Sequence, residues 1–423
     1  MALAENIAAE FNTVDQSGAV GAVRKQAFTA FEKLGIPSTR HEEWKYTNIK
    51  TKLPETLSLQ ANNEDLELSY TSFDAIQATK LVFINGVFYQ NLSIIVPQQG
   101  ITVTNLNTAF AEHNEQVEKH FGKLVQLNEE HFAALNTAFA TDGIYIHLAK
   151  NTIAEAPIII TYLFTGGETF VQSRGLVIAE QGADLQIVEQ FINNSSEAYS
   201  NHVTEVYVGA NAHVNITQLQ TETYNTTAVN TVEAEVGRDA KFTCTAVSFE
   251  GKLIRNNINA RLRGENGEAN FNGLYYAKGE TLIDSHILVD HIVPNCQSNQ
   301  LYKGVIDDEA TGVFNGKIFV KQDAQKTNAF QSSKAILLSD NAAINSKPQL
   351  EIFADDVKCS HGAAIGQLGG NEVFYLMARG IPEADAKAML TFAFANDIIE
   401  KVEIAEIKEH LENVLRERLG LTV

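Results

Sequence analysis

The middle of the chain alternates apolar and polar residues in short runs, and corners rich in glycine, asparagine and aspartate separate these runs. Alternation at every second residue is typical of β-strands. Glycines at four of the corners follow one another at steps of 27, 28 and 27 residues: Gly182, Gly209, Gly237 and Gly264. A fixed period without helices predicts a solenoid whose rungs, of two or three strands, bury their apolar faces on their neighbours. A β-sandwich also spaces strands regularly, but the period favours a parallel β-helix over residues 151–370.

The region before this repeat mixes helical and strand patterns. Apolar residues recur at helical spacing in residues 106–121 and 128–140, which predicts two helices. An apolar run interrupted by Asn85-Gly86 predicts a β-hairpin, because these residues favour the tight turn. Residues 1–150 are therefore expected to form a helical or α+β cap on one end of the β-helix.

The region after the repeat, residues 371–423, is helical in pattern. We expect a strong helix over 384–399 with three apolar residues facing inward: Met389, Phe392 and Ile399. A charged amphipathic helix follows over 402–419. Free strand edges at the ends of a solenoid invite pairing with other chains, so we expect the two flanking regions to act as covers.

Composition and charge narrow the class of protein. The chain has 423 residues and a formal net charge of −20, which argues against a nucleic-acid partner. Its three cysteines, Cys244, Cys296 and Cys359, lie far apart, so they predict no disulfide framework and favour a reducing compartment. The N-terminus lacks the basic region of a signal peptide, and the longest apolar run, 156–164, is too short to cross a membrane. We expect a cytoplasmic protein.

Candidate chemistry concentrates in the stretch Asp355-Asp356-Val357-Lys358-Cys359-Ser360-His361. On an extended backbone Cys359 and His361 face the same way. A thiolate and an imidazole suit iron–sulfur clusters, zinc or copper better than calcium or magnesium. Two ligands do not complete a metal site, so the alternative is a buried thiol beside a hydrogen-bonded histidine.

Other polar groups allow competing interpretations. The acidic pairs Asp307-Asp308 and Asp355-Asp356 are compatible with a carbohydrate-active β-helix enzyme that has an aspartate-lined groove, but aspartates that cap turns are the simpler explanation. Asp284, His286 and Asp290 share one strand face, where we favour a hydrogen-bonded pair over a metal site. We interpret Trp44, in a charged segment, as a packing anchor rather than part of a ligand site. The chain has no phosphate-loop motif, so it is not itself a nucleotide hydrolase.

Several motifs, taken together and in their order, resemble the SufB/SufD family of iron–sulfur cluster assembly proteins. They lie between Asp284 and Ile381: Asp284-Ser285-His286, Pro294-Asn295-Cys296, Phe314-Asn315-Gly316-Lys317, and Cys359-Ser360-His361-Gly362. Within the family, the segment Arg40-His41-Glu42-Glu43-Trp44 is similar to the N-terminal signature of the SufD branch.

The resemblance implies a right-handed parallel β-helix and a non-catalytic scaffold subunit. It implies association with SufB through the β-helix and with SufC, an ATPase of the ABC type, through the C-terminal helices. His361 is the implied ligand of a transient iron–sulfur cluster shared with SufB, and Cys359 is a second ligand or a sulfur carrier. Reduced flavin is associated with the complex in the family, and the isolated subunit is expected to form a homodimer. Cys244 and Cys296 are expected to be packed core thiols.

Overall fold

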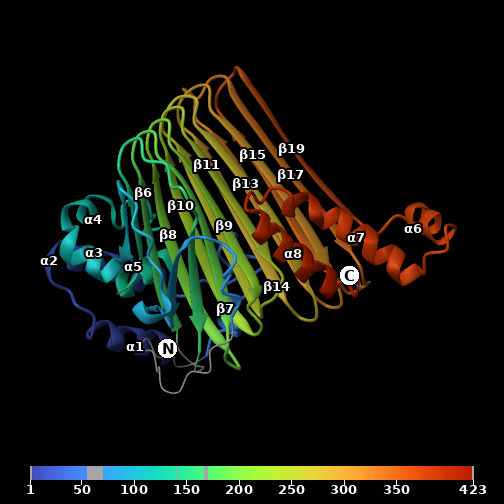
Figure 1. Ribbon diagram of the computed structural model, residues 1–423, viewed down its shortest axis with the longest axis horizontal. Helices are drawn as coiled ribbons and strands as arrows, with labels where there is room; N and C mark the ends of the chain where they lie inside the picture. The colour runs from blue at the N-terminus through green and yellow to red at the C-terminus, as the bar shows by residue number, and fades with distance from the viewer. Residues whose placement is uncertain (1, 55–69, 141, 166–169, 422–423) are drawn as a thin grey trace.

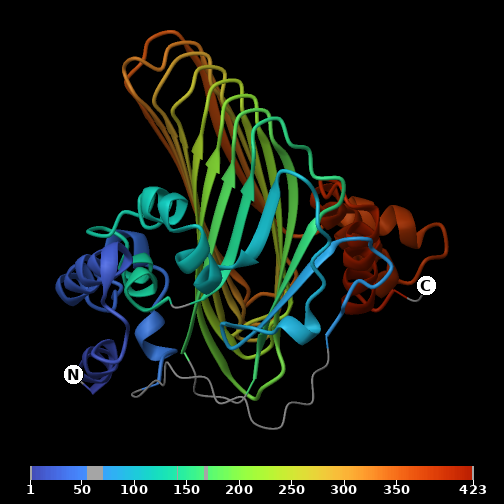
Figure 2. The same ribbon diagram turned by 60° about the vertical axis from the view of Figure 1, so that its left-hand side comes forward.

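The computed structural model describes residues 2–54, 70–140, 142–165 and 170–421. Two long sheets face each other and twist together along the molecule (Figures 1 and 2). From β4 onward the chain passes from one sheet to the other after each strand, so neighbouring strands in a sheet are two strands apart in sequence and run parallel. This architecture confirms the parallel β-helix and shows that each rung has two strands.

The first sheet has ten strands in the order β19-β17-β15-β13-β11-β9-β7-β5-β1-β2. Their bounds are β1 Thr79–Ile84, β2 Val87–Phe88, β5 Ile158–Phe164, β7 Asp184–Asn193, β9 His213–Glu222, β11 Lys241–Ser248, β13 Glu268–Ala277, β15 Gln297–Ile306, β17 Thr327–Leu337 and β19 Val357–Gly366. β2 pairs antiparallel with β1 through a turn at Asn85 and Gly86, which both have positive φ, as the predicted hairpin requires.

The second sheet has nine strands in the order β18-β16-β14-β12-β10-β8-β6-β4-β3. Their bounds are β3 Ile101–Asn105, β4 Gly143–Leu148, β6 Phe170–Ala179, β8 Ala198–Val208, β10 Thr226–Val236, β12 Leu253–Leu262, β14 Leu282–His291, β16 Thr311–Val320 and β18 Ala343–Ile352. β3 is antiparallel to β4, and β4 begins the parallel run. The strands that precede residue 150 therefore extend both sheets at their N-terminal end.

The corners between rungs explain the repeat in the sequence. At seven successive corners that lead from the second sheet back to the first, one residue has positive φ: Asn151, Gly182, Asn211, Asp239, Asn266, Asn295 and, as the exception in residue type, Lys326. Glycine, asparagine and aspartate tolerate this conformation better than other residues. The predicted alignment of Gly182 with Gly209 is thus wrong by two residues, because Asn211 occupies the equivalent position. Asp308 lies at a corner on the opposite side of the solenoid.

The inner faces of the two sheets form the main core. In successive strands the same column of the first sheet holds Ile158, Ile187, Ile216, Cys244 and Phe271, all buried. Large apolar side chains from both sheets fill the space between them. Burying this surface is the dominant favourable term in the stability of the solenoid.

Helices cover the outer face of each sheet. The N-terminal helices are α1 Ala2–Phe11, α2 Gly18–Leu34, α3 Leu106–Glu112, α4 Asn114–His120 and α5 His131–Phe139, with short 3₁₀ turns η1 Glu42–Trp44, η2 Ile49–Thr51 and η3 Gln90–Leu92. α5, together with η1 and α2, packs on the outer face of the second sheet around β6, β8 and β10. Because both faces of these strands are covered, β8 is buried along nearly its whole length.

The C-terminal helices are α6 Gly370–Met377, α7 Glu383–Ile399 and α8 Ala405–Arg418. α8 and the C-terminal half of α7 pack on the outer face of the first sheet, with Ile398, Ile399 and Leu411 fully buried. The prediction that Met389 faces inward is wrong: its side chain is 43% exposed, because the N-terminal half of α7 extends beyond the sheet with α6 (Figure 1). None of the described helices is long and apolar enough to cross a membrane.

Candidate functional site: the open last rung

The last rung of the solenoid has a free edge in each sheet. Within the described residues, β19 pairs only with β17, and β18 pairs only with β16. β18 and β19 are half-buried or exposed along their length, whereas the central strands are buried. An uncovered strand presents unpaired backbone N–H and C=O groups that pair readily with a strand of another chain. The expected covers therefore do not close this end; α6 to α8 lie beside it.

Cys359 lies on β19 and faces the interior of the solenoid. It pairs in register with Ala329 of β17, which is fully buried, and it packs against the apolar cluster of Ile318, Ala329 and Ala354. The thiol is half-buried. This burial raises its pKa, although a hydrogen bond with the Ala329 backbone acts in the opposite direction.

His361 follows two residues later on the same side of β19. It pairs in register with Gln331, which is buried, while the neighbours of Gln331 on β17 are exposed or half-buried. Alternation along a strand therefore places His361 at the interior side of the last rung, beside Cys359. Unlike Cys359, His361 is exposed, because no further rung covers it. The prediction that Cys359 and His361 face the same way is confirmed.

Cys359 and His361 are two potential metal-ligating side chains, which is half the usual number of ligands. Among the described residues, no group of three or more histidine, cysteine, aspartate or glutamate side chains lies close enough together to hold a metal ion. Iron–sulfur clusters and zinc usually take four protein ligands. The donor set at the last rung fits a cluster only if a second chain supplies the remaining ligands.

The other two cysteines lie inside the solenoid. Cys244 and Cys296 are fully buried and unpaired by disulfide, in the main core cluster. Burial raises the pKa of both thiols, that of Cys296 to about 11. A thiol with so high a pKa is protonated and inert at neutral pH, so both are packed core thiols as expected.

Both acidic pairs lie at corners, and one of them bonds to turn amides. Asp307 Oδ1 accepts a hydrogen bond from the Asp308 amide at 2.9 Å, and Asp308 Oδ2 accepts one from the Gly279 amide at 3.2 Å. At the other corner the backbone amide of Asp356 donates to Gln325 Oε1 at 2.9 Å. The contacts of Asp307 and Asp308 support their interpretation as turn-forming residues, and they do not favour the carbohydrate-enzyme alternative.

A second group of residues joins the Trp44 segment to the outer face of the second sheet. Asp284 is fully buried and accepts hydrogen bonds from Thr47 Oγ1 at 2.5 Å and Arg255 Nη1 at 2.9 Å. The Arg255 guanidinium lies 3.8 Å from the centre of the Trp44 ring and donates to the Glu43 carbonyl at 2.7 Å. We call this group of five residues the clasp, since it fastens the N-terminal segment to the solenoid.

His286 extends the clasp on the same strand face. Its Nε2 lies 3.0 Å from Asp284 Oδ1, and its Nδ1 lies 3.3 Å from Glu43 Oε2. The predicted histidine–aspartate pair is therefore confirmed, and Trp44, which is buried against Phe132, is the expected packing anchor. Sequence reasoning missed Arg255, which lies in an ordinary alternating run and carries no motif.

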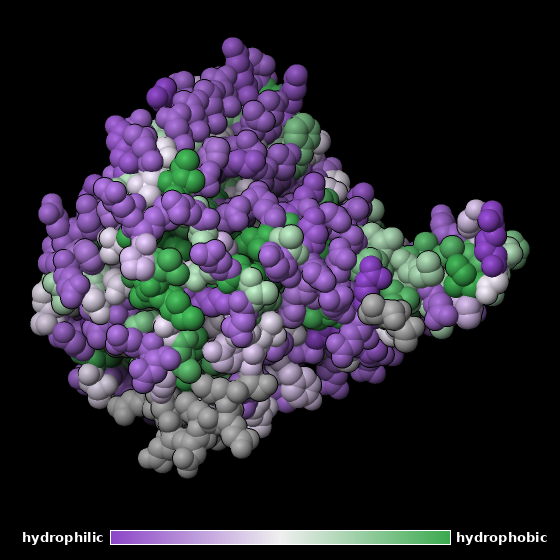
Figure 3. Space-filling model, in the orientation of Figure 1, coloured by the Kyte–Doolittle hydropathy of each residue, from purple (hydrophilic) through white to green (hydrophobic). Residues whose placement is uncertain are grey.

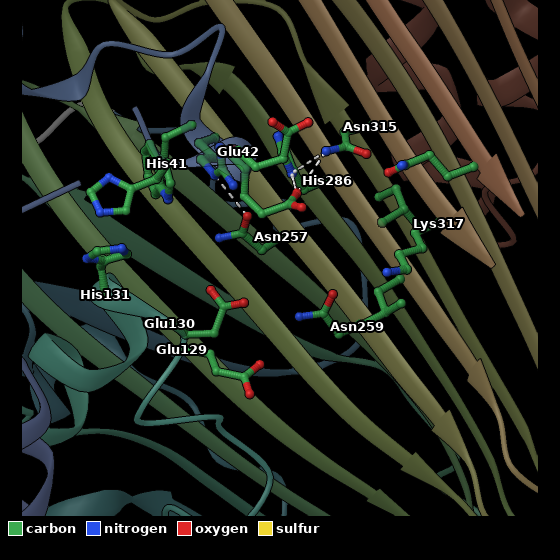
Figure 4. A pocket seen from close by; sticks show the side chains of 16 residues that line it. His41, Glu42, Glu129, Glu130, His131, Asn257, Asn259, His286, Asn315 and Lys317 are labelled. Carbon is green, nitrogen blue, oxygen red and sulfur yellow. Dashed lines mark hydrogen bonds and ion pairs between the residues drawn. The ribbon is translucent and has the colours of Figure 1, made fainter. Parts of the chain in front are cut away.

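Beside the clasp lies a polar cleft of about 390 Å³, bounded by η1, the start of α5 and the strands β12, β14, β16 and β18 of the second sheet (Figure 4). Glu130 points into it, and burial raises the pKa of its carboxyl group. The cleft lies on the outer face of the sheet, whereas Cys359 and His361 face the interior side of the last rung. The two sites are therefore separate.

Comparison with known proteins agrees with this architecture. Residues 162–394 match the family described as "SUF system FeS cluster assembly, SufBD core domain". The chain belongs to the SufBD family. Residues 8–160 match the SufBD protein N-terminal region, so the two family regions together span the N-terminal cap, the solenoid and most of α7.

Named relatives cover nearly the whole chain. A SufBD family iron–sulfur cluster assembly protein of Synechocystis is 32% identical over 404 residues, which are 92% of this chain and 88% of the relative. The iron–sulfur cluster assembly protein SufD of Escherichia coli is 28% identical over 92% of this chain and 90% of its own length. SufD of Bacillus subtilis is 27% identical, over 94% of this chain and 93% of its own length. The chain is thus an iron–sulfur cluster assembly protein of this family.

Proposed function

We propose that this chain is a non-catalytic scaffold subunit of a complex with SufB and SufC. It pairs with SufB through its last rung and binds SufC through its C-terminal helices. At the contact with SufB it contributes to a nascent iron–sulfur cluster. The observation that carries the proposal is the coincidence of two features on one strand: a free edge, and two side chains of cluster-ligand chemistry that are too few to complete a site alone.

Pairing through the last rung is supported by its backbone and its side chains. β18 and β19 offer free hydrogen-bonding groups to a partner strand. Large apolar side chains on and beside this rung are exposed: Phe330, Ile352, Phe353 and Ile365. Covering them with a partner removes apolar surface from water, which stabilises the complex. In the absence of SufB, the same edge accounts for a homodimer.

His361 is the proposed iron ligand. A neutral imidazole offers one ring nitrogen to a metal, and the exposure of His361 leaves it accessible from the partner side. Cys359 is the proposed second ligand or sulfur carrier. Its raised pKa keeps the free thiol protonated at neutral pH, so binding of iron must displace that proton. A site split between two chains holds a cluster only while the chains are in contact, which allows its release.

Docking of SufC is assigned to the projecting part of the C-terminal helices. Figure 3 shows apolar surface where this part extends beyond the sheets. The side chains concerned are exposed, Phe374 at 71% and Tyr375 at 57%. A patch of this kind at the tip of a helical hairpin marks an interaction site. The energy of nucleotide hydrolysis then comes from SufC, because this chain has no phosphate-loop motif.

The test is anaerobic co-expression of the chain with SufB and SufC, followed by measurement of iron–sulfur absorbance per purified complex. His361→Ala is expected to abolish or strongly reduce the absorbance while gel filtration shows an intact complex. The matched control is His213→Ala, which removes an exposed histidine near a corner remote from the last rung. Equal absorbance in wild type and His361→Ala would refute the proposed ligand role of His361.

A further inference from the structure

The side chain beside His361 in the solenoid is Gln331. The two residues are register partners on the parallel strands β19 and β17, so their backbones lie about 4.8 Å apart. Gln331 is 3% exposed, and its Nε2 donates a hydrogen bond of 2.6 Å to Gln300 Oε1 on the preceding rung. Its Oε1 has no hydrogen-bond partner among the described residues, although it is buried.

The interior is shaped around the Gln331 amide. Gly316, on β16 of the facing sheet, leaves the space that the amide fills, because a Cβ at this position would lie 2.2 Å from Gln331 Nε2. Heavy atoms cannot approach so closely without displacement, so any side chain at Gly316 would move the amide. Phe314 closes the same space, since a Cβ at Gly316 would lie 2.6 Å from its ring. The position of Gln331 is therefore fixed from two sides, by Gln300 and by β16.

A buried acceptor without a partner is uncommon and costs free energy. The Gln331 amide donates through its Nε2 to the preceding rung, so a partner for its Oε1 must come from elsewhere. The residue of the following rung in the same column is His361, whose neutral imidazole carries one N–H donor. An imidazole N–H would satisfy the acceptor.

We propose that Gln331 is a positioning residue for His361: its Oε1 accepts the hydrogen bond of one imidazole N–H and so holds the other ring nitrogen, unprotonated, toward the partner side of the last rung. This inference rests on the proposed function of His361 as an iron ligand. The chemistry follows a general rule, since a histidine that binds a metal usually donates its second ring N–H to an oxygen acceptor, which fixes the tautomer and ring orientation.

The first test measures the imidazole tautomer in the isolated chain, without any cluster. The chain is labelled with ¹⁵N-histidine, and the His361 signals are assigned by their loss in His361→Ala. In wild type the two ring nitrogens are expected to give well-separated shifts, as in a single tautomer. Gln331→Leu removes the acceptor, so the shifts should draw together. Gln331→Glu keeps an acceptor oxygen at the same place and should retain the separation.

The matched control is Ser333→Ala, which removes a different buried polar group from the same face of β17. Its register partner is Ala363, so the His361 shifts should stay at their wild-type values. Circular dichroism checks that each variant keeps its β-structure. Wild-type shifts in a folded Gln331→Leu variant would overturn the proposal.

The second test uses the complex with SufB and SufC and measures the rate at which a chelator removes the cluster. Loss of a residue that orients a metal ligand typically weakens metal binding by about 10- to 100-fold, so removal should be at least about tenfold faster in Gln331→Leu. If His361→Ala loses the cluster while Gln331→Leu keeps the wild-type shifts and rate, the positioning role of Gln331 is refuted. The ligand role of His361 then stands. If His361→Ala keeps the cluster, the proposed ligand role fails, whatever Gln331 does.

Discussion

Replacing Asp284 by asparagine tests whether the clasp holds the N-terminal segment on the solenoid. The substitution preserves shape but removes the negative charge that faces Arg255 at 2.9 Å and His286 at 3.0 Å. The side chains of Asp284 and Arg255 are almost completely buried, so water cannot replace the lost partner. The variant should therefore leave the Arg255 guanidinium uncompensated beneath Trp44.

The expected cost follows from the pKa of Asp284 and from the burial of Arg255. Burial alone would raise this pKa, but His286 and Arg255 lower it from 3.8 to about 2. One pKa unit corresponds to about 1.4 kcal/mol, so the folded state gains about 2 kcal/mol from ionised Asp284. Removing one member of a buried ion pair costs about 3–5 kcal/mol in total, because the remaining charge is left without a partner.

The assay is urea unfolding followed by two signals. Trp44 is the single tryptophan of the chain, so its fluorescence reports on the clasp. Far-ultraviolet circular dichroism reports mainly on the two sheets. In Asp284→Asn the fluorescence midpoint should move to lower urea and precede the circular dichroism transition, since the cap detaches first.

The control is Asp290→Asn on the same face of β14. Asp290 pairs with Lys321, whose side chain is 45% exposed, and exposed pairs contribute about 0–1 kcal/mol. This variant should unfold at nearly the wild-type midpoint. If Asp284→Asn behaves like Asp290→Asn, the argument that the buried charges hold the clasp is refuted.

Three further predictions follow from the same structure. Because the folded-state pKa of Asp284 is depressed, the contribution of its carboxylate to the free energy of unfolding is complete above about pH 4 and is lost between about pH 4 and 2. The urea midpoint of the fluorescence signal should therefore fall over that range more in wild type than in Asp284→Asn. Ile365→Lys places a charge on the exposed last strand and should abolish homodimers and pairing with SufB in gel filtration, whereas unchanged elution would exclude this edge as the interface. Phe374→Ser should weaken SufC binding at least about tenfold in calorimetry. The control Tyr224→Ser changes an exposed aromatic residue on a corner and should leave the affinity unchanged; an equal loss of affinity in both variants would contradict docking at α6.

The repeat was predictable because successive rungs share the same alternation along their strands and similar residue types at their corners. Apolar residues alternate along many of the strands, and an asparagine, aspartate or glycine has positive φ at most corners that lead from the second sheet to the first. The exact register was not predictable. The glycines at 209 and 237 are conspicuous in the sequence but lie two residues before Asn211 and Asp239, which hold the left-handed conformation.

The candidate site was predictable in its residues but not in its setting. The spacing of Cys359 and His361 implies a common face, and the strand confirms it. This strand is the open edge of both the sheet and the solenoid because the rungs stop there. No local sequence pattern specifies where the rungs stop. The clasp was missed for a similar reason, since Thr47 and Asp284 are 237 residues apart and meet only because η1 packs on β14.

The most direct test of the central claim asks whether this chain supplies a nitrogen ligand to the cluster. The complex is assembled anaerobically with ¹⁵N-histidine in this chain alone, and the reduced cluster is studied by pulsed electron paramagnetic resonance. The account predicts a ¹⁵N coupling of the strength of a directly bound nitrogen, which His361→Ala removes and His213→Ala retains. A paramagnetic cluster that shows no such coupling in the wild-type complex would contradict it.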